Sequence, residues 1–256
     1  MTFSLINFEI FLLILVRISG FIFTGPFFSL NNVPFRVKTG LAIFLAAIMF
    51  YTVPVPAPGY ESVIEYSILV IREAIAGAII GLFANIAFYI INFAGQIIDM
   101  EIGFSMVNQL DPVTLTQSTI TANIYGYLII LVMIITDLHH YFLRAIIDSF
   151  QVIQLGDVFF RPDMYELMVR FVTDYFIIGF RIVIPIYGSI LVVNTILAIL
   201  SKVAPQINMF VIGIQLKIIV GLFVLAMMIQ LIPSVADFIF NDMITKMRAA
   251  IQLLKP

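Results

Sequence analysis

Charged side chains occur in the middle of the chain's long apolar runs, which is an unusual place for them. A charge at the centre of a bilayer costs about 2.5–3.5 kcal/mol on insertion scales, so these groups must face protein or water. Two kinds of chemistry fit: buried ion pairs that join helices, or a proton-linked relay. The residues are Arg17, Arg72, Glu73, Asp174, Arg181 and Lys217.

Asp137, His139 and His140 are the residues of this chain that could suggest a metal site. Adjacent histidines on a helix point about 100° apart, so only Asp137 and His140 share a face. The chain has no cysteine, and a convincing third ligand is missing. We therefore expect no metal and no cofactor, and a metal-dependent membrane enzyme at Asp137 and His140 is only a third option.

Motifs of other enzyme classes are also missing from the sequence. Ser105 has no neighbouring histidine base, and the chain contains neither a Gly-x-Ser-x-Gly elbow nor a glycine-rich phosphate loop after a strand. We expect a protein that is not an enzyme.

The composition is that of a protein in lipid. Of the 256 residues 62% are hydrophobic and 11% charged, the mean hydropathy is +1.13, and a net charge of -2 argues against nucleic acid as a partner. This predicts an all-α integral membrane protein with a single domain over residues 1–256. The apolar runs predict about six helical segments, at residues 8–30, 39–53, 66–93, 120–136, 171–200 and 207–232.

These segments are too unequal for a simple six-span bundle. Crossing a bilayer takes about 20 helical residues, whereas the second segment is short and the third and fifth would each reach about 42–45 Å. Simple spanning therefore fits these lengths poorly.

Two polar, proline-marked stretches, residues 103–112 and 204–213, interrupt the apolar pattern. Irregular backbone at membrane depth persists only where protein or water surrounds it. Bulky apolar residues in the first stretch could form a water-excluding constriction, although Asp111 before Pro112 also reads as a helix N-cap. The candidate constriction residues are Gly103, Phe104, Ser105, Met106, Leu110, Asp111 and Pro112.

Small residues accompany the charges at helical spacing. Asp174 and Arg181 belong to a seven-residue repeat that continues through Gly188, and Lys217 lies between Gly213 and Gly221. Small residues let helices approach closely, which favours helix packing over a substrate pathway for most of these positions. The candidate packing and assembly residues are Arg17, Pro34, Glu73, Gly77, Gly81, Asp174, Arg181, Pro205, Gln206, Gly213 and Lys217.

Three groups of motifs resemble the FliR family of flagellar biosynthetic proteins, which virulence type III secretion systems share. Order, spacing and total length agree over nearly the whole chain. Two departures lie at Asp137-Leu138-His139, where the family usually has an Asn-Gly-His-like turn, and at Gly156, which replaces a double glycine. The motifs are Arg17, Gly25-Pro26, Asn32, Val33-Pro34 and Arg36-Val37-Lys38 with Gly40-Leu41-Ala42; Ala94-Gly95-Gln96, Gly103-Phe104-Ser105 and Asp111-Pro112; and Ala204-Pro205-Gln206, residues 210–213 and Gly221.

This resemblance implies a subunit of the type III export gate, in the bacterial inner membrane at the flagellar basal body. It also implies helical hairpins in a multi-subunit helical assembly rather than a simple six-span bundle, which would account for the unequal segment lengths. It implies several copies of two smaller membrane proteins, FliP-like and FliQ-like, as partners, together with FlhB-like and FlhA-like components and unfolded export substrates. It also implies that residues 103–121 plug the channel. The alternative from another class is a secondary transporter with a proton-linked site at Asp174, Arg181 and Lys217.

Overall fold

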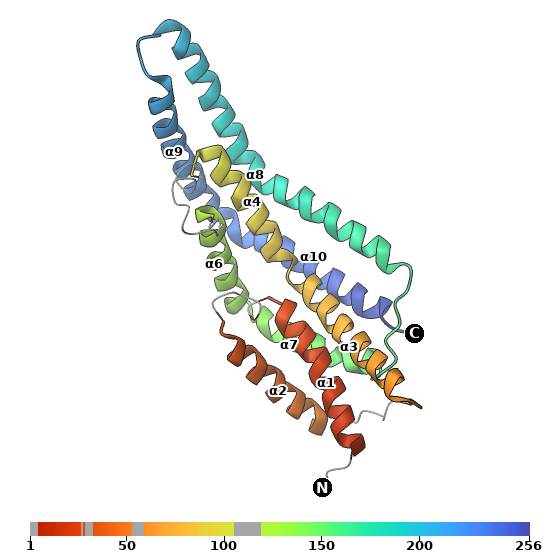
Figure 1. Ribbon diagram of the computed structural model, residues 1–256. Coiled ribbons are helices and arrows are strands. Elements are labelled where there is room, and N and C mark those ends of the chain that lie inside the picture. The colour runs from red at the N-terminus through yellow and green to blue at the C-terminus, as the bar shows by residue number, and fades with distance from the viewer. Residues whose placement is uncertain (1–4, 27, 29–32, 53–58, 105–118) are drawn as a thin grey trace. The chain divides into compact units, whose positions relative to one another are not determined.

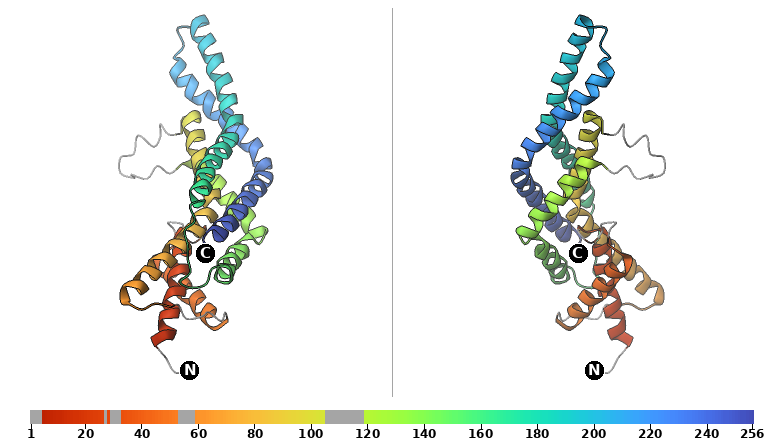
Figure 2. Two further views of the ribbon diagram at one scale, coloured as in Figure 1. Left: turned by 90° about the vertical axis from the view of Figure 1, so that its right-hand side faces the viewer. Right: turned by 90° about the vertical axis from the view of Figure 1, so that its left-hand side faces the viewer.

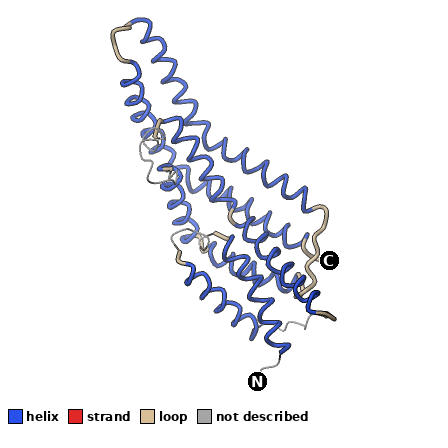
Figure 3. The backbone as a smooth tube through the Cα atoms, viewed as in Figure 1, coloured by secondary structure: helices blue, strands red, loops and turns tan. Residues whose placement is uncertain are grey.

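The computed structural model describes residues 5–26, 28, 33–52, 59–104 and 119–256. Within these ranges the backbone consists of helices, turns and loops, without a β-strand (Figure 3). Five of the helices are long and apolar enough to cross a membrane, or six spans if α6 and α7 count as one broken span. The predicted all-α membrane fold is confirmed.

The helices differ widely in length, as the apolar runs predict. The longest, α8, has 40 residues and would extend about 60 Å at 1.5 Å per residue. The elements are α1 (Leu5–Thr24), α2 (Phe35–Thr52), α3 (Val63–Ala84), α4 (Ile86–Ile102), α6 (Ile120–Ile135), α7 (Leu138–Val152), α8 (Met164–Val203), α9 (Met209–Met228), the 3-10 turn η1 (Ile229–Leu231) and α10 (Ile232–Leu253) (Figure 1).

Helix boundaries follow local chemistry where the side chains supply a cap. The Ser62 side chain accepts a hydrogen bond from Glu65 N–H at 3.3 Å and so caps the start of α3, while the Glu65 side chain accepts from Glu61 N–H at 2.7 Å. Asn208 accepts from the N–H groups of Phe210 and Val211 and begins α9. At the end of α4, Gly103 has φ 100°, a left-handed conformation that favours glycine.

Several predicted boundaries were wrong. The third segment is interrupted at Asn85 and continues as α4 to Ile102, and the first ends at Thr24 rather than Leu30. Helix α7 and most of α10 lie outside the six predicted segments, because charged residues such as Arg144, Asp148 and Asp242 keep their average hydropathy low. In α7 and α10 the sequence indicates a helix through the amphipathic periodicity of its apolar residues, not through average hydropathy.

The described structure forms two compact units that interleave along the chain. Unit 1 contains residues 1–87, 133–172 and 240–256, and unit 2 contains residues 88–132 and 173–239. A single domain over residues 1–256 stays a prediction.

In unit 1, α1 packs against both α2 and α3 (Figure 1). The contact with α3 is a close backbone approach. A Cβ atom added at Gly77 would collide with the Arg17 carbonyl oxygen, and one added at Gly20 would lie 2.5 Å from the Ala74 carbonyl oxygen. The Thr24 hydroxyl lies between the two helices, 2.8 Å from the Gly20 carbonyl oxygen of α1 and 3.1 Å from the Ala78 carbonyl oxygen of α3, and its one proton is shared between these acceptors.

The connection before α3 is also held to α1. The Tyr60 hydroxyl donates to Glu9 Oε2 at 2.5 Å, and the Tyr66 hydroxyl donates to the Glu9 carbonyl at 3.1 Å. The hydrogen bond to the Glu9 carboxylate raises the pKa of Tyr60, since it stabilises the protonated phenol.

In unit 2, the C-terminal half of α8 and α9 form an antiparallel hairpin joined by residues 204–208, visible from each side (Figure 2). Gly213 in α9 faces the Leu197 side chain of α8, and a Cβ atom there would lie 3.2 Å from it. Gly221 faces Ile102 of α4, so a Cβ atom would lie 2.6 Å from that side chain. Of the second polar stretch, residues 204–213, only residues 204–208 form the turn, and Gly213 lies inside α9.

The glycine contacts predict a position-specific cost of substitution. Gly77→Leu should lower the melting temperature and the yield of monodisperse protein in mild detergent, because overpacking costs about 1–3 kcal/mol or more and here forces backbones apart. Gly40→Leu in α2 is the matched control, since a Cβ atom at Gly40 meets nothing within 4 Å. Wild-type melting of Gly77→Leu would contradict the close approach.

Candidate functional site

Arg17 of α1 and Glu73 of α3 form an ion pair in the core of unit 1. Arg17 Nε lies 2.5 Å from Glu73 Oε2, and a terminal guanidinium nitrogen donates to Glu73 Oε1 at 3.0 Å. Both side chains are 0% exposed. This two-pronged geometry is the strongest arrangement available to an arginine and a carboxylate.

The remaining guanidinium protons go to the end of α7 and the turn after it. One terminal nitrogen donates to the carbonyls of Ser149 at 3.3 Å and Ile153 at 3.1 Å, and the other to Gln154 at 3.5 Å. The Phe150 ring lies 4.3 Å from the guanidinium carbon. With the two bonds to Glu73, all five N–H donors of the guanidinium are satisfied.

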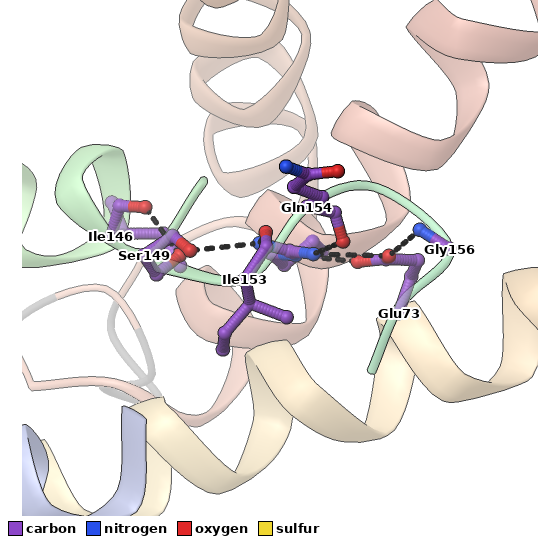
Figure 4. Close-up of polar contacts among 7 residues, drawn as sticks. Glu73, Ile146, Ser149, Ile153, Gln154 and Gly156 are labelled. Atoms are coloured by element: carbon purple, nitrogen blue, oxygen red, sulfur yellow. Dashed lines mark hydrogen bonds and ion pairs between the residues drawn. The ribbon is translucent and has the colours of Figure 1, made fainter. Parts of the chain in front are cut away.

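The turn after α7 also binds the carboxylate. Gly156 N–H donates to Glu73 Oε1 at 2.9 Å, and Figure 4 shows Glu73 between this amide and the carbonyls of Ile153 and Gln154. Gly156 has φ 88°, a conformation that suits glycine and points its amide inward. Three segments distant in sequence therefore meet at one ion pair.

In unit 2, the end of α4 and the start of α6, the helices on either side of the first polar stretch, are fixed to each other. Thr121 N–H donates to both carboxylate oxygens of Asp99, at 3.2 and 3.3 Å, and the Thr121 hydroxyl also donates to Asp99. Asp99 near the end of α4 thus caps the N-terminus of α6, where a carboxylate is favoured. Both residues are 2% exposed.

A glycine brings the same two helices into backbone contact one turn earlier. A Cβ atom on Gly95 would lie 2.5 Å from Ala122 N and 2.6 Å from Ala122 Cα. Helix α6 is in turn tied to α9, because the Tyr125 hydroxyl donates to the Leu225 carbonyl at 3.3 Å. The chain therefore leaves the end of α4 at residue 104 and returns to the start of α6 at residue 119, and these two points are held in place by the contacts among α4, α6 and α9.

The end of α4 borders a cavity of about 200 Å³ that also touches the α8–α9 hairpin. Gly103, Glu101 and Lys217 line it together with Asn194 of α8 and mostly apolar residues of α8 and α9. Phe104 is half-buried. The constriction residues Ser105, Met106, Leu110, Asp111 and Pro112 lie outside the described residues.

The predicted charge stripe on α8 occupies two different settings. Asp174 is half-buried, and Arg181 is exposed at the edge of an apolar cavity of about 290 Å³ that Pro185 and Phe238 also line. Pro34 is exposed just before α2, and Pro205 and Gln206 are exposed in the turn between α8 and α9. Gly81 packs on α1, where a Cβ atom would lie 2.8 Å from the Phe21 carbonyl oxygen.

Four contacts of the structure were not predicted from the sequence. They join Asp99 with Thr121, Gly95 with Ala122, Gly20 with Ala74, and Gly179 with Phe93. Asp99 is a charge inside an apolar helix, the same signal that marks Glu73, but the predicted third segment stopped at Phe93. A Cβ atom at Gly179 would lie 2.9 Å from Cε1 of Phe93. The Phe93 ring itself packs edge-on against Phe176 and Phe180.

A membrane protein built from unequal apolar helices, with a buried ion pair joining α1 and α3, is the class that this fold defines. Residues 8–243 match the model of the family "Bacterial export proteins, family 1", so the chain belongs to that family.

Curated relatives extend over nearly the same length. The chain is 34% identical over 250 residues to "Flagellar biosynthetic protein FliR" of Bacillus subtilis (strain 168), which covers 96% of each chain. It is 28% identical to the protein of that name from Pectobacterium carotovorum subsp. carotovorum, covering 89% of this chain and 87% of the relative. The Escherichia coli (strain K12) protein is 25% identical with the same coverage. The predicted resemblance is confirmed.

The buried ion pair predicts strongly non-additive substitutions. Arg17→Met or Glu73→Leu alone should destabilise the protein by about 3–5 kcal/mol, because each leaves an unpaired buried charge, while the double variant should lose less than the sum. Thermal unfolding of the four proteins in detergent measures the coupling. Arg72→Met is the control, since Arg72 adjoins Glu73 in sequence but is exposed; additive effects would contradict a paired site.

Proposed function

We propose that the chain is a non-enzymatic subunit of the flagellar type III export gate, and that it forms part of the channel through which unfolded flagellar proteins leave the cell. The family match and the names of the relatives support the flagellar export assignment. The location that follows is the inner membrane at the flagellar basal body.

The observation that carries the channel role is the fixed base of residues 103–121. Asp99 and Thr121, with Gly95 against Ala122, hold the start and the end of this stretch together on α4 and α6. The sequence between them combines bulky apolar residues with a hydroxyl-rich continuation. A segment tethered at both ends can cover a pore and be displaced by a passing chain without leaving the subunit. The proposed plug is therefore Gly103 to Thr121.

The surfaces of the helices support a place within an assembly. Helix α9 exposes large apolar side chains around much of its circumference, among them Ile219, Leu222 and Phe223, each more than half exposed. Such surfaces need lipid or protein to cover them. We assign the partners as FliP-like and FliQ-like membrane proteins in several copies, with FlhB-like and FlhA-like components and unfolded substrates alongside.

Deleting Met106 to Leu110 tests the plug. The assembled complex should become permeable to small ions or solutes, because the apolar seal is removed while the anchors at Asp99 and Thr121 remain. Conductance or small-solute uptake is measured in cells at matched complex levels. Replacing the same five residues with glycine and serine keeps the length and should also leak, since flexible polar residues cannot exclude water.

Two results would count against the proposal. A complex that assembles and stays impermeable after the deletion would remove the plug role. Native mass in mild detergent tests the assembly separately: a mass several times that of the chain, with two smaller membrane proteins present, supports the gate, whereas a lone monomer supports the secondary transporter.

A further inference from the structure

Asp137, His139 and His140 bring three metal-binding side chains together where the helix breaks between α6 and α7. One ligand atom from each lies within 4.8 Å of the others. Regular helical spacing would let only Asp137 and His140 share a face. In the structure the His139 ring joins them, because its centroid lies 4.1 Å from that of His140, at an interplanar angle of 39°.

The backbone at Asp137 explains the convergence. Asp137 has φ 55° and ψ 18°, a left-handed conformation that aspartate tolerates better than most residues. Its carboxylate makes no capping hydrogen bond to α7, although it precedes that helix. Asp137 Oδ1 instead lies 3.6 Å from His140 Nδ1.

His139 supplies an independent sign that a ligand belongs here. Among the described residues, its Nδ1 is the one buried side-chain nitrogen or oxygen without a hydrogen-bond partner. A buried polar atom without a partner costs free energy, so native structures rarely leave one unsatisfied. A cation bound at Nδ1 would supply the partner that this nitrogen lacks.

The distances suit a small divalent transition metal. Bonds of about 2.0–2.1 Å from zinc to nitrogen or oxygen place neighbouring tetrahedral ligands about 3.3 Å apart. The 3.6 Å between Asp137 and His140 is close to this value, and shifts of about 1 Å in side-chain position would bring in His139. Imidazole and carboxylate ligands suit zinc and its neighbours better than calcium or magnesium.

We propose that Asp137, His139 and His140 form a zinc-class divalent metal site at the start of α7. The three side chains leave at least one coordination position open to water or to a further ligand. Arg144 lines the same cavity of about 360 Å³ together with Asp137, His140 and Tyr141, and its positive charge opposes the metal. The cavity also gives a route from solvent to Asp137 and His140.

The composition of the chain makes the experiment specific. His139 and His140 are its two histidines and it has no cysteine, so any histidine ligand to a metal must come from this cluster. The full chain is purified in detergent with a tag that contains no histidine and is stripped with a chelator. It is then titrated with Zn²⁺ against a competing indicator, and with Co²⁺ to record its ligand-field absorption.

We expect one saturable Zn²⁺ per chain. His139→Gln, His140→Gln and Asp137→Asn should each weaken Zn²⁺ binding at least about 10- to 100-fold, since even an outer-shell partner of a metal ligand contributes that much. Arg144→Gln should strengthen binding, because it removes an opposing charge. Asp157→Asn is the matched control, an exposed carboxylate outside the cluster, and should bind as the wild type does.

Each variant is first shown by circular dichroism and gel filtration to keep its helix content and its monodispersity. Absence of saturable Zn²⁺ binding by the wild-type chain would overturn the proposal. So would His139→Gln and His140→Gln variants that bind Zn²⁺ as tightly as the wild type. Loss of binding with His140→Gln but not with His139→Gln would reduce the cluster to a local contact between Asp137 and His140, and would also overturn the three-ligand site.

Discussion

The fully buried pair of Arg17 and Glu73 is the constraint on which unit 1 depends. Removing both charges from water is costly, and the cost is offset only if every polar atom finds a partner. Five hydrogen bonds from the guanidinium and one from Gly156 N–H to the carboxylate achieve this. Lysine has three donors and could not replace that pattern.

This requirement fixes more than one side-chain contact. The guanidinium reaches the Ser149 and Ile153 carbonyls only when the C-terminus of α7 lies beside α1, and there the negative end of the helix dipole also favours a cation. The Glu73 carboxylate reaches the Arg17 guanidinium only when α3 lies close to α1, and Gly77 permits this close approach. Charge satisfaction and backbone approach therefore select the same helix register.

The sequence predicts these features unevenly, for physical reasons. Hydropathy predicts the helical class and most apolar helices, because it depends on composition alone. The roles of Glu73 and Gly77 follow from a charge and small residues on one helical face. The partners of Arg17 could not be predicted, since three of them are backbone carbonyls and any residue type can supply a carbonyl. Likewise, the position of the Asp137 carboxylate beside the two histidines could not be predicted from helical spacing, because Asp137 has a left-handed backbone conformation and precedes α7.

The interleaving of the two units along the chain has a consequence for biogenesis. Unit 1 includes the last segment, residues 240–256, whose Leu254 carbonyl accepts a hydrogen bond from Phe159 N–H at 3.0 Å and whose Met247 and Ala250 are buried. These residues emerge from the ribosome after every residue of unit 2. Unit 1 therefore cannot close before residues 240–256 have been synthesised, and its N-terminal helices must remain incomplete until then. Contacts of such long sequence separation form slowly, so the nascent chain passes through a stage in which apolar core surface of unit 1 awaits residues 240–256.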